Sequence, residues 1–227
     1  MIGDALNFIV NGHEAKTGGV MVGGIDQVLE LAARQLEVTV LALAVSLLLA
    51  LPVGLLLGHY GRGEFIAVSA GNAGRAIPEL ALIALMAAAV GVGLFNLVVA
   101  LAILGIPPIL TNTFVGIRQV DRASVEAARG MGMTEGAVIR KVELPLAIPT
   151  IMGGVRTATI NIVATATIAP LAGILTLGDF IISRNVYGDS GVLAGAILVA
   201  LMALLLEAAL AGVQWALTSP GLKLNRT

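Results

Sequence analysis

Two long stretches of this chain carry no charged residue. Residues 38–58 are 21 uncharged positions, and residues 80–117 are 38 more. A helix rises about 1.5 Å per residue, so about 20 residues cross the hydrocarbon core of a bilayer, whereas 38 would extend ~57 Å. The longer stretch must therefore fold back, and its sequence VGVGLFN holds the glycines for a turn. Runs of this kind have to lie in lipid as helices, because lipid cannot hydrogen-bond an exposed backbone.

The composition excludes several other classes of protein. Hydrophobic residues make up 58% and charged residues 12%, with a mean hydropathy of +0.99, whereas soluble domains carry about 25% charged residues. The net charge of -1 does not indicate a nucleic-acid partner. The chain has no cysteine, which excludes disulfides and thiolate metal sites. His13 and His59 lie apart from each other, and we predict solvated or interfacial side chains for both, with no metal site.

The runs predict an all-α membrane protein of about five transmembrane helices. A single permease domain is expected over residues 25–218, after an extracytoplasmic, irregular or surface-lying segment (1–24) and before a polar tail (219–227). The expected spans are 38–58, extended by the amphipathic residues 25–37; 65–90; 95–120, kinked at Pro107 and Pro108; 146–172; and 192–217. Residues 173–191 form a glycine-broken connection, and a sixth span there is the less favoured alternative.

The basic residues predict the orientation in the membrane. Five spans place the chain ends on opposite sides, and cytoplasmic loops carry the excess of Lys and Arg. Lys16 and Arg184 fall on one side, and Arg34 is ambiguous. The other side holds eight basic residues: Arg62, Arg118, Arg122, Arg129, Arg140, Lys141, Lys223 and Arg226. We therefore expect an outside N-terminus and a cytoplasmic C-terminus in the cell membrane.

Residues 121–145, the central polar segment, interrupt the apolar runs on the predicted cytoplasmic side. Residues 123–129 and 137–142 read as two short helical pieces, with Gly130 and Gly132 breaking the chain between them. Thr134 with Glu135 is typical of a helix start. Pro145 is expected to end the second piece and begin the fourth span. By composition alone, the segment is also compatible with an ordinary cytoplasmic loop.

The spacing within this segment resembles the EAA loop of ABC-importer permeases. That pattern is Glu-Ala-Ala, three residues, Gly, nine residues, Ile, any residue, Leu-Pro. The matching positions are Glu126, Ala127, Ala128, Gly132, Leu144 and Pro145, with Val142 in place of Ile. The flanking sequences TNTFVGIRQVDRASVEAARGMGM and ELPLAIPTIMGGVRTATINIVATATIA resemble permeases for quaternary-ammonium osmoprotectants. The resemblance covers about residues 31–217, and it departs at GILTLG, where the family has a glycine-rich turn.

The resemblance implies a type I ABC importer permease bundle with a cytoplasmic coupling helix. In that family, the EAA loop docks on an ATPase subunit, which implies docking through Glu126 and a turn at Gly132. It further implies two ATPase subunits that bind ATP and Mg, a second permease copy as a homodimer, and an extracytoplasmic substrate-binding protein. This chain has no phosphate-binding loop of the pattern Gly-x4-Gly-Lys-Ser/Thr. We therefore expect no catalytic residue and no cofactor in this chain itself.

Several polar side chains fall within the predicted spans, where charge is costly. We predict that Arg156 pairs with Glu207, and Arg75 with Glu79 or across the bundle. Either pair is open to a structural role or to one in the path or gate. A polar stripe in the fourth span, Thr157, Asn161 and Thr165, is equally open between helix packing and a translocation path wall. The small-xxx-small pairs Gly54 and Gly58, and Gly191 and Gly195, indicate helix packing.

Two alternatives to osmoprotectant import stay open at this point. A methionine-type amino-acid permease shares the five-span layout and the EAA loop. An ion-gradient-driven transporter could use Glu79 and Glu207 as proton or cation sites, but it does not need the EAA spacing and usually shows inverted repeats. Capture of a quaternary ammonium needs an aromatic cage, and the chain has only one Trp and two Tyr. That scarcity favours capture by a separate binding protein.

Overall fold

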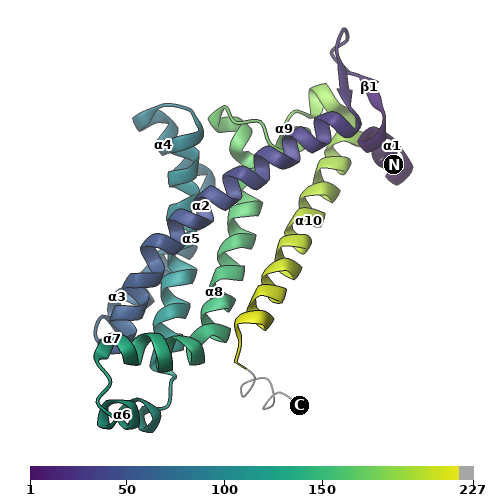
Figure 1. The fold of residues 1–227 in the computed structure, drawn as a ribbon. Coiled ribbons are helices and arrows are strands. Elements are labelled where there is room, and N and C mark those ends of the chain that lie inside the picture. The colour runs from purple at the N-terminus through teal and green to yellow at the C-terminus, as the bar shows by residue number, and fades with distance from the viewer. Residues whose placement is uncertain (220–227) are drawn as a thin grey trace. The chain divides into compact units, whose positions relative to one another are not determined.

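The computed structural model describes residues 1–219, except the side chains of residues 68 and 73–75. Nearly all of this part is helical (Figure 1). The elements are α1 (Ile2–Val10), β1 (Gly12–Glu14), β2 (Met21–Gly23), α2 (Gly24–Tyr60), α3 (Glu64–Ala76), α4 (Glu79–Val90), α5 (Leu94–Arg118), α6 (Arg122–Gly130), α7 (Glu135–Val138), a π-helical turn (Ile139–Glu143), α8 (Leu144–Thr165), a 3-10 helix (Ala166–Ala172), α9 (Gly178–Ile182) and α10 (Arg184–Leu217). Of the predicted tail (219–227), only residue 219 belongs to the described residues.

Four helical stretches of the described chain are long and apolar enough to cross a membrane. They are Gly24–Tyr60, Leu94–Arg118, Glu135–Ala172 and Arg184–Leu217. These match the predicted first, third, fourth and fifth spans, and residues 25–37 do extend the first helix. The prediction of one continuous second span over 65–90 is wrong, because the chain there forms α3 and the short apolar α4. Pro78 breaks it, since proline lacks an N–H and disfavours helix at the preceding residue.

The described chain divides into two compact units. Unit 1 comprises residues 1–43, 78–102 and 160–205, and unit 2 comprises residues 44–77, 103–159 and the described residues from 206 onward. Four of the five boundaries fall inside the long helices α2, α5, α8 and α10, and the fifth lies between α3 and α4. Each unit therefore gathers helix portions that are distant in sequence around its own set of contacts.

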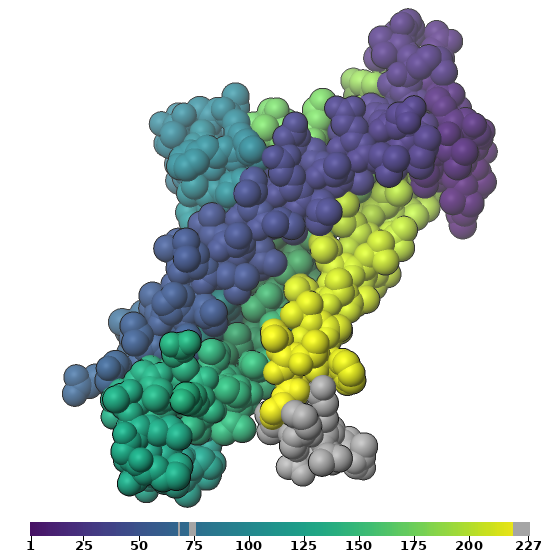
Figure 2. All heavy atoms as spheres, in the orientation of Figure 1, coloured from purple at the N-terminus to yellow at the C-terminus, as the bar shows by residue number. Residues whose placement is uncertain are grey.

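Unit 1 is centred on a cluster of aromatic side chains. Phe8 of α1 meets Phe180 of α9 edge to face, with ring centroids 5.3 Å apart, and Phe180 meets Tyr187 of α10 at 4.9 Å. All three side chains are buried. Of the two forms predicted for residues 1–24, irregular or surface-lying, the irregular one is wrong: the residues form α1 and an antiparallel β1–β2 hairpin. Figure 2 shows these purple residues against the start of α10, where the Lys16 N–H donates to the Val186 carbonyl at 3.0 Å.

The predicted connection of residues 173–191 is a tight turn, the five-residue α9 and the first turns of α10. Gly178 lies so close to the Thr167 backbone that a Cβ there would stand 1.8 Å from the Thr167 carbonyl oxygen. The Thr176 hydroxyl also donates to the Ala166 carbonyl at 2.9 Å. A sixth span does not form here, because α9 is far shorter than the ~20 residues that a span needs.

In unit 2, small residues allow helices to pack closely. A Cβ added at Gly54 would stand 2.7 Å from Thr113, and one at Gly58 would stand 2.7 Å from Ile117. Both contacts join α2 to α5, as the small-xxx-small spacing predicts. At Gly154 of α8, a Cβ would stand 2.6 Å from the Pro108 carbonyl oxygen of α5. These glycines of α2 and α8 thus let both helices pack closely on α5.

Candidate functional site

The first helix of the central polar segment, α6, begins at a side-chain cap. Asp121 accepts hydrogen bonds from the Ala123 and Ser124 N–H groups at 3.3 and 3.1 Å, and from the Ser124 hydroxyl at 3.0 Å. These bonds, that of the Ser124 hydroxyl first, hold the pKa of Asp121 below its usual value. The cap fixes where α6 starts, and so which of its residues face outward.

The EAA residues divide between the two faces of α6. Val125 and Ala128 are buried, whereas Glu126 and Ala127 are exposed. Ala127 and Ala128 therefore lie on different faces of α6. The exposed side also holds Met131, a large apolar side chain that is 72% exposed. Glu126 and Ala127 expose a carboxylate and a methyl group on α6, and the thioether of Met131 is exposed directly after the helix, which makes this surface suited to docking on another protein.

A left-handed glycine turns the chain after α6. Gly132 has a φ of +81°, which disfavours any residue with a Cβ. Gly130, by contrast, is the last residue of α6, so only Gly132 makes the turn. Thr134 then caps α7, its hydroxyl accepting from the Ala137 N–H at 3.4 Å. The helix start that Thr134 and Glu135 predict is confirmed.

Pro145 does not end the second helical piece, contrary to prediction. Helix continues from Glu135 to Ala172, with residues 139–143 in a π-helical turn. The Leu144 N–H bonds back to the Ile139 carbonyl, five residues away. The wider turn shifts the hydrogen-bonding pattern just before Pro145, which then lies in the first turn of α8, where a missing N–H is tolerated. Leu144 and Pro145 of the motif thus lie at a π-to-α junction.

A buried cluster of ionisable side chains lies at this junction, and the prediction of a solvated His59 is wrong. Its side chain, at the end of α2, is fully buried rather than solvated. Nδ1 lies 2.6 Å from Oε2 of the buried Glu143, and Nε2 lies 2.8 Å from Oε2 of Glu135. Glu135 also accepts from Arg129 of α6 at 2.9 Å. The sequence gives little indication of this cluster. His59 follows an apolar run, and the other members belong to the central polar segment, where charged side chains are usually solvated.

Two of the predicted path residues meet in unit 1. The Thr165 hydroxyl donates to Oε2 of Glu79 at 2.7 Å. Glu79 begins α4, where a carboxylate also favours the helix N-terminus. Thr165 is buried, whereas Glu79 is exposed. The predicted partner Arg75 has a side chain that lies outside the described residues.

The polar stripe of α8 is partly open and partly packed. Thr157 and Asn161 are exposed, and Ile160 between them is 42% exposed, whereas Thr165 is buried. The Thr157 hydroxyl donates to the Gly153 carbonyl of its own helix at 3.0 Å, so it does not join α8 to another helix by that bond. One side of α8 therefore presents polar groups that the described fold leaves uncovered.

Arg156 and Glu207 lie together in unit 2. Arg156 Nε donates to Glu207 Oε1 at 2.7 Å, Nη2 contacts the same oxygen, and Nη1 donates to Gln214 Oε1 at 3.2 Å. The two side chains of the pair remain 33% and 28% exposed. The pair links α8 to α10 within unit 2.

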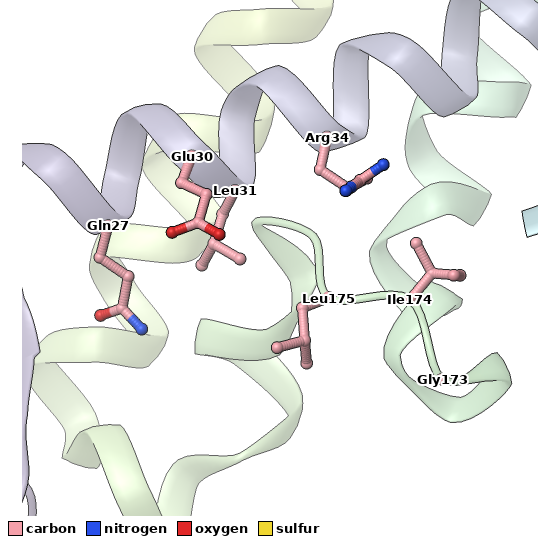
Figure 3. A pocket seen from close by; sticks show the side chains of 7 residues that line it. All are labelled: Gln27, Glu30, Leu31, Arg34, Gly173, Ile174 and Leu175. Atoms are coloured by element: carbon pink, nitrogen blue, oxygen red, sulfur yellow. The ribbon is translucent and has the colours of Figure 1, made fainter. Parts of the chain in front are cut away.

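Unit 1 carries a polar pocket of about 350 Å³ beside α2 (Figure 3). Its lining residues are Gln27, Glu30, Leu31, Arg34, Gly173, Ile174 and Leu175. The last three belong to the turn where the sequence departs from the glycine-rich family pattern. None of the seven is aromatic, and Phe8, Phe180 and Tyr187 pack on one another in the core instead. The pocket thus differs from an aromatic cage for a quaternary ammonium.

Known proteins resemble this chain over most of its length. The family described as "Binding-protein-dependent transport system inner membrane component" matches residues 50–217. The choline transport system permease protein OpuBB of Bacillus subtilis (strain 168) is 35% identical over 189 residues, 83% of this chain and 87% of that protein. The carnitine transport permease protein OpuCB of Listeria monocytogenes is 35% identical over 191 residues, 84% of this chain and 88% of that protein.

Solved structures agree on the fold. A chain of the MetNI methionine ABC transporter in an inward-facing conformation superposes with a TM-score of 0.75, over 86% of this chain and 98% of that chain, at 24% identity. An amino acid ABC transporter with histidines gives a TM-score of 0.63 at 22% identity, over 85% of this chain and 92% of that chain. Together with the family match, this shows the predicted all-α, type I importer permease fold. The chain belongs to the inner membrane component family of binding-protein-dependent transport systems, the permease subunits of ABC importers.

Proposed function

We propose that this chain conducts a quaternary-ammonium osmoprotectant, such as glycine betaine, choline or carnitine, as the membrane subunit of an ATP-driven importer. The observation that carries the substrate class is the similarity to permeases named for choline and carnitine, at 35% identity over more than four-fifths of the chain. The methionine transporter shares the fold at lower identity, 24%. A methionine substrate is therefore the less supported alternative.

The outward side of α6 supports an ATPase partner. Glu126 and Ala127 are exposed beside Met131, and the capped, glycine-terminated helix holds them in place. The sequence has no phosphate-binding loop of its own, so ATP and Mg would bind to the partner. We propose an assembly with two ATPase subunits, a second copy of this chain and an extracytoplasmic substrate-binding protein.

The proposed orientation places the central polar segment in the cytoplasm, where ATP is available. The excess of basic residues in and around this segment supports it by the positive-inside rule. Residues 1–24 would then face outward and meet the binding protein's side of the membrane. The C-terminal tail would be cytoplasmic.

The conduction path is proposed along the open side of α8. Thr157 and Asn161 are exposed there, and Thr165 holds the Glu79 carboxylate at the start of α4. A carboxylate within an apolar region attracts a permanent cation that cannot donate hydrogen bonds. Glu79 would thus favour a quaternary ammonium over an anionic solute.

The direct test is uptake into vesicles that hold this chain with its partner ATPase and binding protein. Labelled glycine betaine, choline and methionine are compared, once with ATP and once with an ion gradient alone. We expect ATP-dependent uptake of at least one quaternary amine and no uptake from the gradient alone.

The other outcomes each correct a different part of the proposal. ATP-dependent uptake of methionine alone would keep the importer class and overturn the substrate. Uptake driven by the gradient without ATP would overturn the ATP-driven mechanism and favour a secondary transporter.

A further inference from the structure

The cluster around His59 has no role in the function proposed so far. His59 lies in the last turn of α2, Glu143 ends the π-helical turn, Glu135 begins α7 and Arg129 belongs to α6. One imidazole thus contacts two carboxylates of the central polar segment. At this place in unit 2, that segment and a long apolar helix share a buried hydrogen bond between two ionisable side chains.

Glu143 is the more strongly held of the two carboxylates. Its side chain is 1% exposed, and its bond to His59 Nδ1 is 2.6 Å long. A carboxylate buried this deeply is stable only with a hydrogen-bonded or charged partner. Glu135 is half exposed, and its 2.8 Å approach to Nε2 lacks the alignment of a hydrogen bond. The His59–Glu143 pair is therefore the main attachment, and Glu135 is the secondary one.

The backbone at Glu143 explains how the carboxylate reaches His59. Residues 139–143 form the wide turn that joins α7 to α8. Such π-turns re-aim side chains and are frequent at functional sites. Glu143 is the unspecified position of the EAA pattern, between Val142 and Leu144. The motif therefore leaves open the residue that the turn directs into the core.

Two further contacts extend the attachment in both directions. Through Glu135, the cluster reaches Arg129 of α6 at 2.9 Å. Through Gly58, the residue before His59, α2 lies directly against Ile117 of α5. A displacement of α6 can thus be transmitted to α2 through the contacts of Arg129, Glu135 and His59, and from α2 to α5 through close packing.

We propose that His59 is a positioning residue for coupling: it ties the junction of α7 and α8 to the end of α2, so that a force on α6 moves these helices together. This inference rests on the proposed function for its coupling readout, but the attachment itself can be measured on the isolated chain.

The chain has no cysteine, which permits a direct measurement of position. Cysteines are placed at Arg62, an exposed site after α2, and at Met131, the exposed site after α6, and both are spin-labelled. The distance distribution between the labels is expected to be narrow with His59 and to broaden with His59→Ala. A matched control is His13→Ala, because His13 lies in the β1 strand of unit 1 and contacts only Asn7 and Asn11 among the hydrogen bonds described.

The functional readout is the ratio of ATP hydrolysed to substrate transported, per folded complex. With His59→Ala we expect this ratio to rise by about tenfold, the size of an ordinary coupling between sites. The variant His59→Asn keeps an amide near the position of Nδ1. Combined with Glu143→Gln, it replaces the imidazole–carboxylate bond by an amide–amide hydrogen bond, and we expect this double variant to fold and to recover most of the coupling.

Three results would overturn the proposal. One is an unchanged label distance and an unchanged ratio in His59→Ala. Another is a loss of folded protein alone, with the ratio per folded complex unchanged, which would make His59 merely structural. If His59→Ala does not fold, the double variant decides, and a rise of its ratio by tenfold or more would count against the proposal. Failure of the wild-type complex to transport would instead refute the proposed function, and the label distances would still test the attachment.

Discussion

Unit 2 contains two charged clusters that differ chiefly in burial. Arg156 and Glu207 remain 33% and 28% exposed, whereas His59 and Glu143 are 0% and 1% exposed. The first pair joins two long helices, and the second joins a long helix to the central polar segment. The cost of removing one partner rises with the burial of the charge that remains. The comparison therefore predicts a large effect at Glu143, a smaller one at Arg156, and little at the exposed carboxylates of α6.

Loss of Glu143 should have the largest effect on stability. Glu143→Ala leaves His59 buried without its main partner, and we expect the free energy of unfolding to fall by about 3–5 kcal/mol. Denaturant unfolding of the purified chain in detergent measures it. Glu143→Gln, which can still hydrogen-bond, serves as the control and should cost clearly less. Equal losses for both variants would show that the charge is unimportant there.

The Arg156–Glu207 pair should contribute about 1 kcal/mol, as polar pairs between membrane helices commonly do. Arg156→Ala and Glu207→Ala are each expected to lower stability by this amount. The charge-swapped double variant, Arg156→Glu with Glu207→Arg, should recover part of the loss of the swapped single variants. A double variant that recovers nothing would argue against the pairing. A loss of stability as large as that at Glu143 would show that burial does not set the size of the effect.

Glu126 should matter for coupling and hardly at all for folding. Its side chain is exposed on α6, so Glu126→Arg should change the free energy of unfolding by no more than about 0.5 kcal/mol. We expect uptake to fall by about tenfold or more while the ATPase subunits still hydrolyse ATP. Uptake at the wild-type rate would refute the docking role of Glu126.

Asp121 should give the smallest effect, and one that depends on pH. Its pKa lies below the ordinary value of 3.8, because the Ser124 hydroxyl and two backbone N–H groups bond its charged form. The cap therefore stabilises fully above the unfolded pKa, and its contribution is lost as pH falls through the lower, folded value. The difference in melting temperature between wild type and Asp121→Asn should be constant from neutral pH to about pH 5 and shrink below 3.8. A difference independent of pH would refute an ionic cap.

The two clusters also differ in how visible they are in the sequence. Arg156 and Glu207 interrupt apolar runs, where an isolated charge requires a partner, and each lies about ten residues from the end of its span. Their opposite signs and similar depth suffice to pair them. His59 follows an apolar run and Glu143 belongs to a polar segment, so neither position demands a partner. Only the packing of α2 against the π-turn buries them together.

The same distinction applies to the backbone. Pro78 and Gly132 act locally, through a missing N–H and a permitted left-handed conformation, and sequence reasoning can find such positions. The turn predicted at Gly132 is confirmed, whereas the break at Pro78 lies within a mostly apolar stretch that predicts one continuous helix. At Pro145 it expected a break that the π-turn removes. The fold of residues 1–24 was not foreseen either, since Phe8 orders them only by packing on Phe180 and Tyr187.

By itself, the sequence determined the membrane class, the spans at Val38–Gly58 and 192–217, and the EAA spacing, because each follows from hydrophobicity or from residues close together in the chain. The tertiary structure alone decided which polar groups are buried and with whom. Such pairings join residues as distant as His59 and Glu143, 84 positions apart. Local propensity does not predict a pairing between residues so far apart in the chain. The burial that this packing produces sets the free-energy cost of losing one partner.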